Sequence, residues 1–91
     1  MIYAIKWTST FKHSYKLAKK RGLPIDELKK IVDKLRTDTP LPAKFKDHEL
    51  SGRYVGLREC HIKPDWLLLY LKEDDILTLT LVDTGSHADL F

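Results

Sequence analysis

Cysteine is nearly absent from this chain of 91 residues, because Cys60 is the only one. A single cysteine excludes an internal disulfide framework and any metal site built from several cysteines. Long hydrophobic runs are absent too, since the longest, Trp66 to Leu71, is far too short to span a bilayer. The first residues lack the apolar segment and cleavage site of a signal peptide. These absences predict one domain over residues 1–91, cytoplasmic and without a membrane partner.

Acidic residues are scarce in the first half of the chain and basic residues are scarce in the second. Residues 1–46 contain twelve Lys and Arg against four Asp and Glu, a net charge of +8. Residues 47–91 contain four Lys and Arg against nine Asp and Glu, a net charge of −5, and they hold three of the four histidines. The basic half predicts contact with a polyanion such as RNA, or with an acidic protein partner.

Hydrophobic periodicity predicts a strand over residues 3–7 followed by two helices. Thr8, Ser9 and Thr10 offer N-cap oxygens to the first helix, which stops at Gly22. The second helix begins at Pro24 and ends before residues 37–43, where two prolines forbid its continuation. Its apolar stripe is Ile25, Leu28, either Ile31 or Val32, and Leu35.

The pattern then changes to period two. We expect a strand over residues 53–62 with a bulge at Gly56, and a turn at Pro64–Asp65. A central strand buried on both faces follows over residues 66–71, a hairpin loop over 72–75, and a last strand over 76–82. The order β-α-α-β-β-β predicts an α+β fold with two helices packed on an antiparallel sheet.

Three histidines, His48, His61 and His87, lie close to predicted strand ends or turns. Histidine is the side chain most readily poised for proton transfer near neutral pH. Glu59 and Asp65 are close to His61 in sequence, and an antiparallel sheet can bring separate strand ends together. Such groups are sufficient for metal-independent RNA cleavage, in which the RNA supplies its own 2′-hydroxyl nucleophile and a basic side chain stabilises the phosphate.

Other chemistries compete with this interpretation. A zinc site could use His48, His61, His87 and Asp65, although no short paired-ligand spacing supports it. Cys60 is predicted to be inert, because successive strand residues point to opposite faces and His61 therefore cannot activate its thiol. The ring of Trp66 could stack on a splayed base or simply belong to the core.

Three segments, LPAKFKDHEL-SG, LRECHIKPDWLLLY and TGSHADLF, together resemble the YafQ-type toxins of the RelE superfamily, and the similarity spans almost the entire chain. These proteins are the toxin halves of bacterial type II toxin–antitoxin pairs. The resemblance implies a RelE-like fold and an endoribonuclease that cuts mRNA in the ribosomal A site without a metal or other cofactor. It also implies a cognate antitoxin with an acidic segment, and contact with operator DNA only through the antitoxin complex.

The resemblance also assigns residues. His48, His61, Asp65 and His87 match the family's catalytic or RNA-contacting positions, Phe91 matches its functional terminal aromatic, and Trp66 and Glu59 match further functional positions. On this basis His87 is the expected general acid, with His48 or Asp65 as the base.

One position departs from the family, because Asp83 stands where an arginine is usual. An aspartate would repel the scissile phosphate, so Arg53 or Arg58 is the expected replacement. The departure keeps a second function open: a catalytically weak relative that binds antitoxin and regulates transcription.

Overall fold

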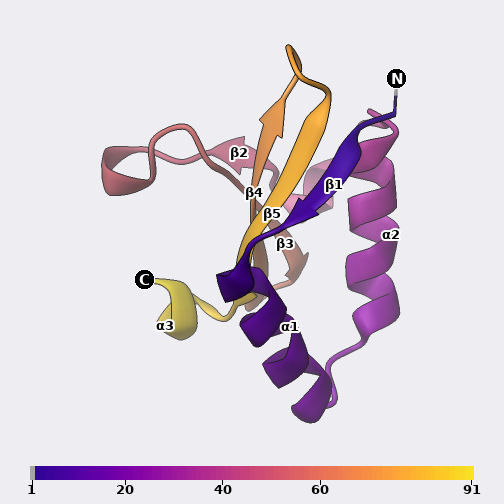
Figure 1. Cartoon of the computed structure of the whole chain (residues 1–91). Helices are drawn as coiled ribbons and strands as arrows, with labels where there is room; N and C mark the ends of the chain where they lie inside the picture. Colours follow the sequence, from indigo (N-terminus) through magenta and orange to yellow (C-terminus); the bar gives the residue numbers. More distant parts are fainter. Residues whose placement is uncertain (1) are drawn as a thin grey trace.

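The computed structural model describes residues 2–91, which form an α+β domain with a five-stranded sheet (Figure 1). The predicted fold class is confirmed. In chain order the elements are β1 (Ala4–Trp7), α1 (Ser9–Lys20), α2 (Ile25–Arg36), η1 (Ala43–Phe45), β2 (His48–Glu49), η2 (Gly52–Tyr54), β3 (Arg58–Lys63), β4 (Trp66–Glu73), β5 (Thr78–Gly85) and α3 (His87–Leu90).

Local sequence signals explain where the first two helices begin and end. The Thr8 side chain caps α1 by accepting from the backbone N–H of Phe11. Gly22 ends α1 with a positive φ of 74°, and the backbone N–H of Leu23 donates to the Ala18 carbonyl in a Schellman arrangement. Pro24 precedes α2 as its N-cap, so both predicted helices are confirmed to within a residue.

The sheet has the strand order β1-β5-β4-β3-β2. Three of its four pairings are antiparallel, but β1 runs parallel to β5, so the sheet is mixed rather than wholly antiparallel as predicted. The reason is long-range: β1 pairs with the last strand of the chain, and its few residues contain nothing that specifies direction. The central position predicted for the apolar run is confirmed, because residues 66–70 of β4 are all buried.

The strand predicted over residues 53–62 begins only at Arg58. Residues 52–54 form a 3₁₀ turn, and Gly56 has φ +95° in the following turn, so it marks no bulge. The register shifts instead lie between His61 and Lys63 of β3 and between Leu69 and Tyr70 of β4 opposite β5. The last strand is also displaced from its prediction, because it runs from Thr78 to Gly85.

The two faces of the sheet differ in what covers them. The main core holds side chains from α1, α2 and alternate residues of the strands, among them Leu28, Ile31, Cys60 and Tyr70. Leu67 and Leu69 of β4 are also buried but lie outside this core cluster, because neighbouring strand residues point to opposite faces. This second face is the one that carries the candidate site. No helix within residues 2–91 is long and apolar enough to cross a membrane.

Candidate functional site

The alternation of β3 sorts its side chains into a core set and a site set. Cys60 and Ile62 point into the core, whereas Glu59 and His61 share the other face. Glu59 is only 5% exposed, and its Oε1 lies 3.3 Å from His61 Nε2. A buried carboxylate is costly unless it has partners, so an imidazole beside it stabilises the ionised form.

His48 reaches the same carboxylate from the neighbouring strand. It stands directly opposite Glu59 in the β2–β3 register, with its Nε2 3.7 Å from Glu59 Oε1. Its Nδ1 lies 2.6 Å from the backbone carbonyl of Lys46. Because a carbonyl can only accept, Nδ1 carries the proton and Nε2 is the atom presented to the site.

His87 is the first residue of α3, and a second carboxylate orients it. Asp65, in the turn between β3 and β4, accepts from the His87 backbone N–H at 3.0 Å and lies 2.7 Å from His87 Nδ1. These two contacts, the backbone one first, lower the pKa of Asp65, so the carboxylate stays ionised. His87 Nε2 is therefore left free to face the site.

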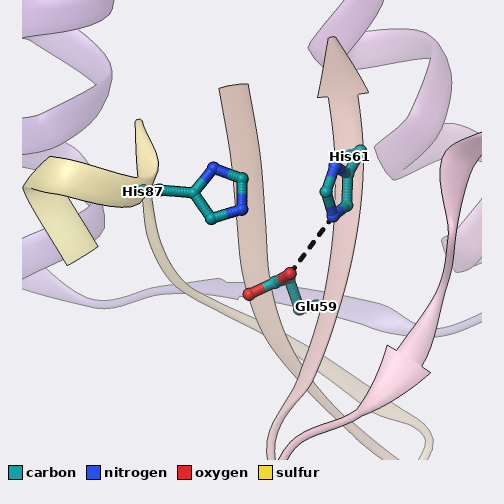
Figure 2. Close-up of side chains that lie close together, drawn as sticks. All are labelled: Glu59, His61 and His87. Atoms are coloured by element: carbon teal, nitrogen blue, oxygen red, sulfur yellow. Dashed lines mark ion pairs between the residues drawn. The ribbon is translucent and has the colours of Figure 1, made fainter. Parts of the chain in front are cut away.

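Figure 2 shows His87 reaching from α3 toward the strand that carries Glu59 and His61. The His61 and His87 rings lie 5.6 Å apart between centroids, at an interplanar angle of 62°. Ligand atoms of Glu59, His61 and His87 all fall within 4.8 Å of one another. The structure thus brings together the predicted histidines His48, His61 and His87 on one face, with Asp65 behind His87.

A smaller aromatic group lies at the end of the chain. Phe91 is 56% exposed, and its ring meets the Tyr54 ring edge-on, with 5.3 Å between the two centroids. The Arg53 guanidinium lies over the Tyr54 ring, with its Cζ 5.3 Å from the centroid. The Tyr54 hydroxyl donates to the Leu90 carbonyl at 3.2 Å. Sequence reasoning missed Tyr54, although an aromatic residue beside Arg53 in a glycine-flanked loop was an available signal. Together these groups offer a stacking surface and a cation.

Two predicted RNA contacts are not at the site. Trp66 is 2% exposed and belongs to the main core, so its ring has no free face on which a base could stack. Arg58 alternates with Glu59 along β3 and pairs instead with Asp47 and Glu49. Sequence proximity to the histidines does not specify the face of the strand, so the structure brings neither residue together with them, and Trp66 occupies the core position that was its other possibility.

Asp83 is also engaged away from the histidines. Its Oδ1 accepts from the Ser14 hydroxyl at 2.6 Å and from the Thr84 backbone N–H at 2.8 Å, so it ties α1 to β5. Asp83 itself occupies the position where the family usually has an arginine, so an arginine that contacts the phosphate would have to come from another position.

Cys60 is fully buried, and its predicted inertness agrees with this environment. Burial, assisted by Asp47 and Glu59, raises the pKa of its thiol to about 12. A thiol that remains protonated is a poor nucleophile and a poor metal ligand.

Residues 3–91 match the family described as the bacterial toxin of type II toxin–antitoxin system, YafQ. This chain belongs to the YafQ toxin family. A member named mRNA interferase toxin YafQ, from Escherichia coli strain K12, is 40% identical over 88 residues, which cover 96% of this chain and 94% of that protein. The resemblance identified from the sequence motifs is confirmed.

Solved structures give the same relationship. The YafQ chain of the E. coli DinJ–YafQ toxin–antitoxin complex superposes with a TM-score of 0.90 at 37% identity, over 100% of this YafQ-family chain and 99% of that chain. A metal-bound toxin from Helicobacter pylori superposes with a TM-score of 0.91 at 42% identity, over 100% of both chains. The first of these relatives binds an antitoxin, and the second holds a metal.

Proposed function

We propose that this YafQ-family toxin is a ribosome-dependent endoribonuclease that cleaves mRNA in the A site by metal-independent acid–base attack of the 2′-hydroxyl. The observation that carries this proposal is that two histidines with different orienting groups converge on one face of the sheet. His87 is held at Nδ1 by Asp65, and His48 is held at Nδ1 by the Lys46 carbonyl. Each histidine therefore presents its Nε2 to the site, with the ring orientation fixed through Nδ1.

The two histidines take opposite roles in this mechanism. His48 Nε2 removes the 2′-hydroxyl proton, and the carboxylate of Glu59 stabilises the imidazolium that forms. The 2′-oxygen then bonds to phosphorus while the bond from phosphorus to the 5′-oxygen breaks. His87, protonated beside ionised Asp65, gives its Nε2 proton to the leaving 5′-oxygen. The products are a 2′,3′-cyclic phosphate and a 5′-hydroxyl end.

Asp65 is assigned to orientation rather than to the base. Its Oδ1 already accepts both the backbone N–H and the ring N–H of His87, so this oxygen is poorly placed to receive a substrate proton. This geometry supports His48 over Asp65 as the proposed base. His61 shares Glu59 with His48 and lies beside His87, a position suited to binding the scissile phosphate.

Arg53 is the proposed replacement for the usual arginine. It is exposed, and it lies with Tyr54 and Phe91 next to α3, which begins with His87. In this arrangement the guanidinium contacts a phosphate while the aromatic rings contact an adjacent base.

Action at the ribosome is supported by the basic half of the chain. The exposed lysines of α1 and α2 can follow an RNA backbone, and the members of this family that match most of the chain are named mRNA interferases. Such a target places the protein's action in the cytoplasm.

An antitoxin with an acidic segment is the proposed inhibitor. The relative in complex with DinJ shows that a protein of this fold binds an antitoxin. In this chain an apolar groove between β1 and α2 exposes Ile5 and Trp7 beside Lys29 and Arg36, which suits a segment of mixed apolar and acidic residues. Binding to operator DNA would then occur only through the antitoxin of the complex.

The nuclease claim is tested by inducing the protein and mapping new mRNA 5′ ends. We expect growth arrest and new ends within codons, both lost in His87→Ala but retained in His13→Ala, which removes an exposed histidine of α1. Cleavage on ribosomes in Mg²⁺ buffer should persist when the purified toxin has first been treated with EDTA and the chelator removed. Unchanged growth and no new ends from a soluble protein would contradict the proposal.

A metal-dependent reaction is the second candidate, because Glu59, His61 and His87 form a possible three-ligand group and a relative is metal-bound. The group differs from the zinc set expected from the sequence, since Glu59 takes the place of His48 and Asp65. Loss of cleavage after EDTA treatment of the toxin and removal of the chelator, with recovery on adding Zn²⁺ or Cu²⁺, would favour this candidate over the metal-independent mechanism.

Asp83 decides between an active nuclease and a weak relative that mainly binds antitoxin. We predict that Asp83→Arg raises the cleavage rate about 10-fold or more, because it restores the arginine that is usual at this position, whose charge would attract the scissile phosphate. Asp75→Arg, in the exposed β4–β5 turn, makes the same charge change elsewhere and should have little effect. A rate that falls in Asp83→Arg would show that the Ser14–Asp83 contact is itself required.

A further inference from the structure

The strand that carries His48 is too short to position it alone. β2 has two residues, His48 and Glu49, which pair with Glu59 and Arg58 of β3. A two-residue ladder contributes few hydrogen bonds, and β2 lies at the edge of the sheet. The distance between His48 and Glu59 therefore depends on something besides the ladder.

Arg58 contacts both residues that flank His48. Its Nη2 lies 3.3 Å from Asp47 Oδ2, its Nη1 lies 3.6 Å from Glu49 Oε1, and its Nε donates to Asp47 Oδ1 at 3.3 Å. Although partial burial opposes the charge of Arg58, the hydrogen bonds to Asp47 and Tyr70 raise its pKa. The guanidinium thus holds β2 from the face opposite His48.

Tyr70 connects this ion pair to the centre of the sheet. It is 1% exposed, pairs with Arg58 in the β3–β4 register, and donates a short hydrogen bond from its hydroxyl to Asp47. Arg58 Nε also donates to the Tyr70 hydroxyl at 3.3 Å. Burial and the bond to Asp47 raise the pKa of Tyr70, so the hydroxyl remains a donor. Asp47 is therefore anchored to the buried central strand β4.

We propose that Arg58, Asp47 and Tyr70 are positioning residues, which we term the β2 clamp, that hold His48 Nε2 toward Glu59. The inference rests on the proposed function, in which His48 takes the 2′-hydroxyl proton. Clamped at Asp47 and Glu49, β2 can neither rotate nor slide along β3, and the Nδ1 contact with Lys46 then fixes the ring. The clamp contacts no RNA and acts only through His48.

Tyr70→Phe is the most conservative test, because it removes one hydroxyl and keeps the ring in the core. Arg58→Met removes the charge and retains an aliphatic side chain. Lys72→Met is the matched control. Lys72 also lies on β4 and lines one surface pocket together with Arg58 and Tyr70, but its ion pair is with Asp38 and not with a residue of β2 or its flank. The readouts are the His48 ring nitrogen NMR signals and single-turnover mRNA cleavage on ribosomes.

We expect Tyr70→Phe and Arg58→Met to change the His48 tautomer signals. Both should lower the maximal single-turnover rate about 10-fold or more, with half-saturating ribosome concentration unchanged. Lys72→Met should leave both readouts as in the unsubstituted protein. Unchanged His48 signals in a folded Tyr70→Phe protein, or equal losses in Lys72→Met, would overturn the clamp. If the unsubstituted protein does not cleave mRNA, the proposed function fails, whereas the His48 signals still decide whether the clamp exists.

Discussion

In both proposed proton-transfer histidines, Nδ1 contacts an oxygen atom, and the two oxygens belong to different chemical groups. The acceptor for His48 is a neutral carbonyl, that of Lys46, whereas the acceptor for His87 is the ionised carboxylate of Asp65. A neutral acceptor fixes the tautomer of a base, and a charged one favours the protonated ring of an acid. The proposed assignment of His48 as base and His87 as acid rests on this difference.

Cys60 provides a prediction at the scale of one residue. The thiol, with its pKa raised to about 12 by burial, should not react with iodoacetamide at pH 8 in the folded protein. Mass spectrometry after labelling, with and without denaturant, measures this. Modification at equal rates in both conditions would show that the side chain is accessible.

At the scale of elements, period-two alternation was the most informative signal in the sequence. It predicted that Cys60 and His61 point to opposite faces, and it implied that Glu59 and His61 share one. It could not reveal β2, because a strand of two residues is too short to show alternation. It also could not show that Arg58 contacts Asp47, since that contact depends on how β2 pairs with β3. The Asp65–His87 contact joins residues 22 positions apart, and it exists only because the β3–β4 turn and the end of β5 meet.

α3 is held by contacts that its four residues do not predict. Ser86 and Asp89 form a capping box, and Asp89 also accepts at 2.9 Å from Arg21, the C-cap residue of α1. Gly85 permits this arrangement, since a Cβ there would lie 2.9 Å from the Asp89 Cβ. The helix that begins with His87 is thus fixed against α1.

Lowering the pH should break the ion pair between Arg21 and Asp89. The bond from Arg21, followed by the Ser86 backbone N–H, lowers the pKa of Asp89 to about 2 from its usual 3.8. The stabilisation is therefore complete above about pH 4 and is lost as pH falls through about 2. Asp89→Asn should lower the melting temperature by about 2–5 °C at pH 7 and have no effect below pH 2. An equal difference at both pH values would contradict this account.

At the scale of the whole molecule, the charge asymmetry of the sequence corresponds to two regions of the fold. The basic half contains α1 and α2. The acidic half contains β3, β4, β5 and α3, and within it lie Glu59, His61 and His87, with Asp65 in the β3–β4 turn. The mixed direction of the sheet was not predictable, because parallel pairing of β1 with β5 depends on contacts across the full length of the chain. We interpret the basic region as the binding surface and the acidic region as the site of chemistry.

The most direct test of acid–base cleavage is the chemistry of the RNA ends produced on programmed ribosomes in Mg²⁺ buffer by purified toxin stripped beforehand of bound metal. We predict 2′,3′-cyclic phosphate and 5′-hydroxyl ends, with the rate reduced at least about 100-fold in both His48→Gln and His87→Gln. 5′-Phosphate ends, or full activity in both variants, would contradict the account.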